Sequence, residues 1–164
     1  MSDRLPPLYP WPLDRLLNRI ATEWDQRNEI FSLAGRRFFK PDPTVDLSCE
    51  IAGRRVATPV GPAAGPHTQL AQNIALSWLA GARTFELKTV QILDELDIER
   101  PCIDMENVGY NIEWSQELTL AESLVEYAKS ALLLAVLRRW EPLAERLGDQ
   151  TGAVGDHAFE LSVG

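Results

Sequence analysis

Apolar side chains recur every three or four residues near the start of the chain, at positions 13, 16, 17, 20, 21, 24 and 31. This period of about 3.6 residues predicts an amphipathic helix over residues 13–31. Pro12 suits its first turn, because a proline there removes no intrahelical hydrogen bond. Gly35 and the prolines at positions 41 and 43 predict a loop after the helix.

The pattern then changes to that of a sheet. Leu47–Ile51 and Arg54–Ala57 predict two short strands around a turn at Ala52 and Gly53. This segment is therefore expected to form a β-hairpin.

A strand–helix–strand pattern follows over about 35 residues, which is typical of a βαβ unit with parallel strands. We expect a short strand at Thr58–Ala63, a helix from Thr68 to Gly81 and a second strand over residues 84–92. Residues 93–114 are polar and have no clear period.

Thr119 and Glu122 match a capping box, which predicts the start of a long, largely apolar helix. Pro142 should kink or restart this helix before Gly148. The last apolar stretch, Ala158–Val163, predicts a third parallel strand beside Thr84–Lys88.

Three such strands cannot close a barrel, which needs eight units and about 250 residues. The chain is either a small open sheet or the first part of a longer protein, and we favour the second, since parallel sheets are covered on both faces. Residues 1–45 would form an N-terminal helix and linker, and residues 46–164 the sheet-containing domain.

Composition narrows the class of protein. The chain has 164 residues, of which 45% are hydrophobic, and a net charge of −8 that argues against nucleic-acid binding. It has no 18-residue apolar run or signal-peptide pattern, so a cytoplasmic protein without membrane contact is expected. Cys49 and Cys102 lack the spacing of a disulfide framework or metal cluster.

Two features could carry chemistry. The small residues of Gly61–Pro66 follow a predicted parallel strand, where α/β proteins bind cofactors, although a tight turn would use the same residues. Lys88 is one of only three lysines beside 13 arginines, and it interrupts an apolar strand. Its ammonium group would face either a pocket above the sheet or the carboxylate of Glu86, two residues away.

Weaker candidates remain. Asn111 offers an amide that could recognise a lactam or pyrimidine edge, or could simply support a turn. His67 and His157 are 90 residues apart and have no metal-ligand spacing. No metal site is therefore predicted.

Three segments together resemble the FMN-binding barrel of dihydroorotate and dihydropyrimidine dehydrogenases: Thr58–Gly65, Glu86–Gln91 and Tyr110–Glu113. Longer stretches, Gly61–Asn73 and Glu86–Asp94, are similar to the N-terminal barrel of the large iron–sulfur flavoproteins described as selenate reductase subunits.

The resemblance implies an α/β fold, the first three or so strands of a (β/α)8 TIM barrel with FMN above the carboxyl ends of its strands. Ala63, Ala64 and Gly65 would line the flavin, Lys88 and Thr89 would contact its ring, and Asn111 would bind substrate. No catalytic acid or base is assigned, because that loop would lie beyond residue 164.

The implied activity is FMN-dependent transfer of a hydride between flavin and a pyrimidine-like small molecule. The 4Fe–4S clusters and a nicotinamide cofactor belong to the C-terminal part of such proteins, so this chain alone should be inactive. Its macromolecular partner would be the remainder of the enzyme or a second copy. The alternative is a catalytically inert fragment or assembly module that pairs with another chain through an exposed sheet edge.

Overall fold

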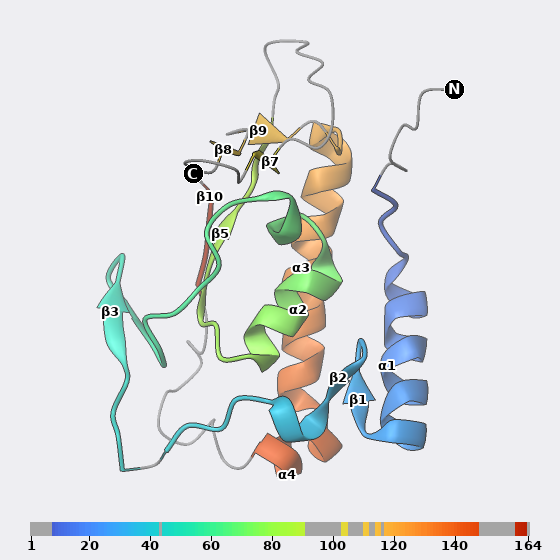
Figure 1. Cartoon of the computed structure of the whole chain (residues 1–164), viewed down its shortest axis with the longest axis vertical. Coiled ribbons are helices and arrows are strands. Elements are labelled where there is room, and N and C mark those ends of the chain that lie inside the picture. The colour runs from blue at the N-terminus through green and yellow to red at the C-terminus, as the bar shows by residue number, and fades with distance from the viewer. Residues whose placement is uncertain are drawn as a thin grey trace.

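The structure is a computed structural model that describes residues 8–42, 44–90, 103–104, 110–111, 114–115, 117–147 and 160–163. Its helices are α1 Leu13–Arg27, α2 Ala71–Leu79, α3 Leu120–Arg139 and α4 Glu141–Leu147, with single 3-10 turns at Gly35–Arg37 and Pro66–Thr68. Figure 1 shows α2 and α3 packed together beside the paired strands β5 (Thr84–Leu87) and β10 (Glu160–Val163).

Helix α1 ends four residues before the predicted end. Asn28 adopts a left-handed conformation with φ of 58° and closes the helix through its backbone N–H. A short hairpin follows, in which β1 (Glu29–Ile30) pairs with β2 (Leu33–Ala34). Phe31 matches the helical period because it is buried, but it lies in the hairpin turn with φ of 49°.

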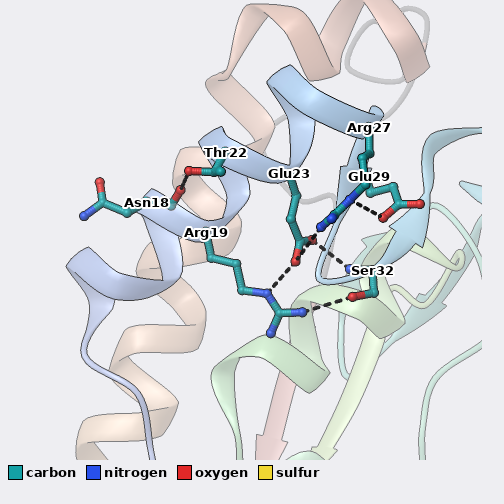
Figure 2. A network of polar contacts seen from close by, with 7 residues as sticks. All are labelled: Asn18, Arg19, Thr22, Glu23, Arg27, Glu29 and Ser32. Atoms are coloured by element: carbon teal, nitrogen blue, oxygen red, sulfur yellow. Dashed lines mark hydrogen bonds and ion pairs between the residues drawn. The ribbon is translucent and has the colours of Figure 1, made fainter.

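The carboxylate of Glu23 ties this hairpin to α1 (Figure 2). It accepts a hydrogen bond from Arg19 Nε at 2.6 Å and another from the Ser32 backbone N–H at 2.8 Å, while Arg27 lies 3.8 Å away. Burial opposes ionisation of Glu23, but these hydrogen bonds and the two arginine charges outweigh it and lower its pKa. The network holds Ser32 in its left-handed conformation, with φ of 64°.

The hairpin predicted from Leu47–Ile51 and Arg54–Ala57 is confirmed. Strand β3 (Cys49–Ile51) pairs antiparallel with β4 (Arg54–Val56). Both turn residues have positive φ, 52° at Ala52 and 75° at Gly53, as a two-residue hairpin turn requires.

The parallel sheet is confirmed in part. Strand β10 pairs in parallel with β5, so that Glu160 lies opposite Thr84 and Val163 opposite Leu87. The predicted strand at Thr58–Ala63 is not a regular strand, although it runs along β5. The amide of Thr84 bonds to Val60 O and that of Glu86 to Pro62 O, both at 3.4 Å. Pro62 has no N–H to return the bond that a parallel ladder requires at that position.

The predicted strand over residues 84–92 is also interrupted. It breaks at Lys88, between β5 and the two-residue strand β6 (Thr89–Val90), which pairs in parallel with β9 (Trp114–Ser115). Strands β7 (Ile103–Asp104) and β8 (Tyr110–Asn111) pair antiparallel. The expected loop at Asn111 is therefore a short strand, and the residues of 91–116 outside β7, β8 and β9 lie outside the described part of the chain.

The hydrophobic core lies between α1, α2, α3 and β5. Strand β1 and helix α4 also contribute to it. Its most buried large side chains are Leu16, Ile30, Ile74, Leu79, Phe85, Leu133, Leu134, Leu137 and Leu143. The predicted capping box opens α3, since Thr119 and Glu122 exchange side-chain-to-backbone hydrogen bonds. The chain restarts as α4 around Pro142, as expected. Among the described residues, no helix is long and apolar enough to cross a membrane.

Candidate functional site

The small-residue loop lies unusually close to β5. A Cβ atom added to Gly61 would lie 1.9 Å from the backbone oxygen of Thr84, so that only glycine permits this approach. The hydrogen bonds to Val60 and Pro62 share one register along β5.

Side chains from two directions hold this loop in place. Glu86 of β5 accepts the backbone N–H of Ala64 at 3.0 Å. Thr68, in the turn before α2, accepts the N–H of Gly65 at 3.2 Å and donates its hydroxyl hydrogen to Gly65 O at 3.0 Å. Ala63 stays exposed while Gly65 is buried, so the loop presents a fixed backbone edge at the carboxyl end of β5.

Lys88 is a buried lysine at the same end of the strand, with a relative exposure of 2%. Its backbone oxygen accepts a hydrogen bond from the Tyr127 hydroxyl at 2.6 Å. Burial raises the pKa of Tyr127 to about 12, so the phenol stays protonated and continues to donate at neutral pH. Helix α3 thus fixes the backbone at the break between β5 and β6.

Glu86 and Lys88 do not share an environment, although an uninterrupted strand would place them on one face. Glu86 is exposed and bonds to Ala64, whereas Lys88 is buried. The break in the strand at Lys88 removes the strict alternation that would have placed the two side chains on one face, which was the basis for considering Glu86 as a partner of Lys88.

The other predicted site residues lie on neighbouring segments. Thr89 is half-buried at the start of β6 and pairs with Trp114 of β9. Asn111 pairs with Ile103 and precedes β9 by three residues. The backbone therefore connects Asn111 to the strand that borders Thr89, while the side chain of Asn111 lies outside the described part.

A second polar group lies behind the loop, at the start of α2. Glu126 of α3 is fully buried and accepts the N–H of Ala71 at 3.0 Å. It also forms an ion pair with Lys129, whose ammonium group donates to Trp11 O at 2.7 Å. A carboxylate at a helix N-terminus is favourable because it offsets the positive end of the helix dipole.

Sequence reasoning missed Thr68, Tyr127 and Glu126. Thr68 had a local signal, since a hydroxyl residue three positions after a glycine can cap a turn. Tyr127 and Glu126 had none, because their partners are 39 and 55 residues away. His67 is exposed in the turn before α2. The described residues contain no group of three or more His, Cys, Asp or Glu side chains able to hold a metal ion.

The sequence matches a known family of barrel domains. The family described as "Oxidoreductase YgfK, N-terminal TIM-barrel domain" matches residues 31–164. The chain belongs to this family of N-terminal TIM-barrel domains.

Two similar curated proteins are both named "Putative oxidoreductase YgfK", from Escherichia coli strain K12 and from E. coli O157:H7. Each is 51% identical to this chain over 155 residues, which is 94% of the chain and 14% of the relative. The chain thus spans about one seventh of the length of these relatives. No solved structure is significantly similar to it.

Proposed function

We propose that this chain supplies the first β/α units of an FMN-binding barrel in a longer oxidoreductase, which passes a hydride between the flavin and a pyrimidine-like or related small molecule. The observation that carries the proposal is that Glu86 holds the Ala63–Gly65 loop at the carboxyl end of β5, two residues before the buried Lys88. Active sites of TIM barrels lie at this end of the strands.

The residues present fit a flavin. The loop has no large side chain and exposes Ala63, so a flat ring can approach its backbone. Bound FMN would supply the hydride-accepting and hydride-donating ring. Lys88 would supply a fixed positive charge that stabilises the reduced, anionic ring, Thr89 would contact the ring and Asn111 would orient the substrate.

The phosphate group of FMN is expected to bind elsewhere. Phosphate sites of TIM barrels lie in the loops after strands 7 and 8, and this chain supplies only early strands. We therefore expect the chain alone to bind FMN weakly and to have no activity. The iron–sulfur clusters and the nicotinamide site of the full-length protein would lie in its other regions.

The test uses a chimera: the full-length E. coli relative with its matched 155 residues replaced by those of this chain. The chimera should purify with the absorbance of bound flavin. A colourless chimera that gains no such absorbance when FMN is added would refute the cofactor proposal.

Lys88→Met in the chimera should lower the flavin midpoint potential. One charge in a partly screened site corresponds to roughly 2–4 kcal/mol. Lys40→Met is the matched control, because Lys40 is exposed in the loop after the 3-10 turn Gly35–Arg37 and its substitution should leave the potential unchanged.

The alternative is that Lys88 has only a structural role. In that case Lys88→Met should lower stability and leave the flavin midpoint potential unchanged. That result would refute the proposed role of Lys88 beside the flavin.

A further inference from the structure

Lys88 is the point at which two separate strand pairs meet. Strand β5 pairs with β10 up to Leu87, and β6 begins at Thr89 and pairs with β9. Lys88 itself belongs to neither ladder, so the alternation of side chains along a strand does not set the direction of its own side chain. Another contact therefore decides where the ammonium group of Lys88 lies.

The hydroxyl group of Tyr127 makes a contact of this kind. It donates a hydrogen bond to Lys88 O at 2.6 Å, across 39 residues of sequence. The carbonyl oxygen of Lys88 lies in the rigid peptide plane between Lys88 and Thr89, so holding this oxygen restricts the rotation ψ of Lys88. Because ψ relates the peptide plane to the Cα–Cβ bond, the hydrogen bond also restricts the direction in which the side chain of Lys88 leaves the backbone.

Helix α3 is anchored on either side of Tyr127. The neighbouring residue Glu126 is fully buried and accepts the N–H of Ala71 at the start of α2, at 3.0 Å. Lys129 forms an ion pair with Glu126 and donates to Trp11 O, just before α1, at 2.7 Å. These contacts fix the position of α3 along its own axis relative to α2 and to the segment before α1. The hydroxyl group of Tyr127 therefore has a defined place in the fold.

We propose that Tyr127 is a positioning residue, which directs the ammonium group of Lys88 toward the ligand at the carboxyl end of β5. This inference rests on the proposed flavin site and adds to it a residue that acts on the flavin only through Lys88. Glu126 and Tyr127 are adjacent on α3, and Ala71 follows Gly65 by six residues. One turn of α3 thus holds both the segment that carries the loop and the backbone of the lysine, and it sets their relative position.

The competing interpretation is that the hydrogen bond from Tyr127 contributes to stability alone. Thr58 provides a control for that interpretation, because its hydroxyl group makes a bond of the same kind. Thr58 is 4% exposed, and its Oγ1 donates to Gly81 O at 2.8 Å, across 23 residues. Gly81 precedes β5, so this bond lies at the amino end of the strand, away from Lys88. Thr58→Val removes the bond and nearly preserves the shape of the side chain.

The experiment measures the flavin midpoint potential and the thermal midpoint of the full-length chimera. Tyr127→Phe should lower the equilibrium constant for flavin reduction by about 2- to 10-fold, which is the range that the loss of one hydrogen bond corresponds to. The shift should have the same direction as that of Lys88→Met and should be smaller, because the charge is displaced and not removed. Thr58→Val should lower the thermal midpoint by a comparable amount and should leave the potential unchanged.

A double variant separates the role of Tyr127 from that of Lys88. In the Lys88→Met background, Tyr127→Phe should cause no further change in potential, because its effect passes through Lys88. An equal shift with and without Lys88 would overturn the positioning role, and so would a Phe variant that does not fold, since the bond would then be structural. If Lys88→Met lowers the potential and Tyr127→Phe does not, the flavin site stands and the role of Tyr127 is wrong. If neither substitution changes the potential, or if the chimera binds no flavin, the proposed function fails and this inference fails with it.

Discussion

Replacing Gly61 by alanine should separate the loop that carries Ala63–Gly65 from β5. The new Cβ would lie 1.9 Å from Thr84 O, 2.4 Å from Thr84 Oγ1 and 2.7 Å from the Thr84 carbonyl carbon. Two of these atoms belong to the backbone of a paired strand and cannot rotate away. Restoring an ordinary van der Waals contact requires the loop to move by about 1.5 Å.

That movement has a cost that the structure allows us to work out. Three hydrogen bonds join the loop to the start of β5, from Arg83 N and Thr84 N to Val60 O and from Glu86 N to Pro62 O. Each contributes about 0.5–1.5 kcal/mol, and overpacking adds about 1–3 kcal/mol. The expected loss of unfolding free energy is therefore roughly 3–7 kcal/mol, which is a large part of the stability of an ordinary domain.

Urea unfolding followed by circular dichroism measures this loss, with an expected decrease in midpoint of about 2 M. Gly53→Ala is the matched control. A Cβ there meets nothing within 4 Å, and only the positive φ of 75° disfavours alanine, so its cost should be about 1 kcal/mol. If Gly61→Ala is no more destabilising than Gly53→Ala, the close approach to β5 is not a constraint and the reasoning fails.

Two further outcomes are expected. The pKa of Glu23 is lowered in the folded protein. Its ionised form therefore stabilises the fold at pH values above its ordinary pKa of 4.5, and this stabilisation is lost as the pH falls through the lowered pKa of the folded state. Glu23→Gln should therefore flatten the acid limb of the pH–stability curve and cost about 1–2 kcal/mol at pH 7, measured by urea unfolding; an unchanged acid limb would contradict the ion pair with Arg19. Tyr127→Phe should cost about 1 kcal/mol through the lost bond to Lys88 O. Since burial raises the pKa of Tyr127 to about 12, the parent should also lose stability as the pH rises from 10 toward 12, a loss that the Phe variant should lack.

The sequence by itself determined the elements whose signals are local. The capping box at Thr119, the hairpin turn at Ala52 and Gly53, and the restart at Pro142 all depend on contacts within about four residues. The local sequence is then enough to predict each of these elements, and all three lie at the residues where the sequence pattern predicts them. The family resemblance is of the same kind, because it rests on short contiguous motifs, and it led to the oxidoreductase barrel class that the family match confirms.

Long-range packing limited what the apolar pattern could predict. Phe31 is apolar at a position that continues the helical period, but it lies in the hairpin turn, where it is buried. The apolar pattern shows that a side chain is buried and does not show which backbone conformation brings it into the core. The segment at Thr58–Ala63 has the composition of a strand, but Pro62 removes one of the bonds that would make it regular.

Only the tertiary structure decided how the candidate site is held. Glu86 reaches Ala64 across 22 residues, Tyr127 reaches Lys88 across 39 and Glu126 reaches Ala71 across 55. None of these pairs has a sequence signature, because a hydrogen bond between distant residues depends on the register of the sheet and the position of α3 against it. The register of the sheet and the position of α3 are set by the burial of apolar surface across the whole core. They therefore cannot be predicted from residues that are neighbours in the sequence.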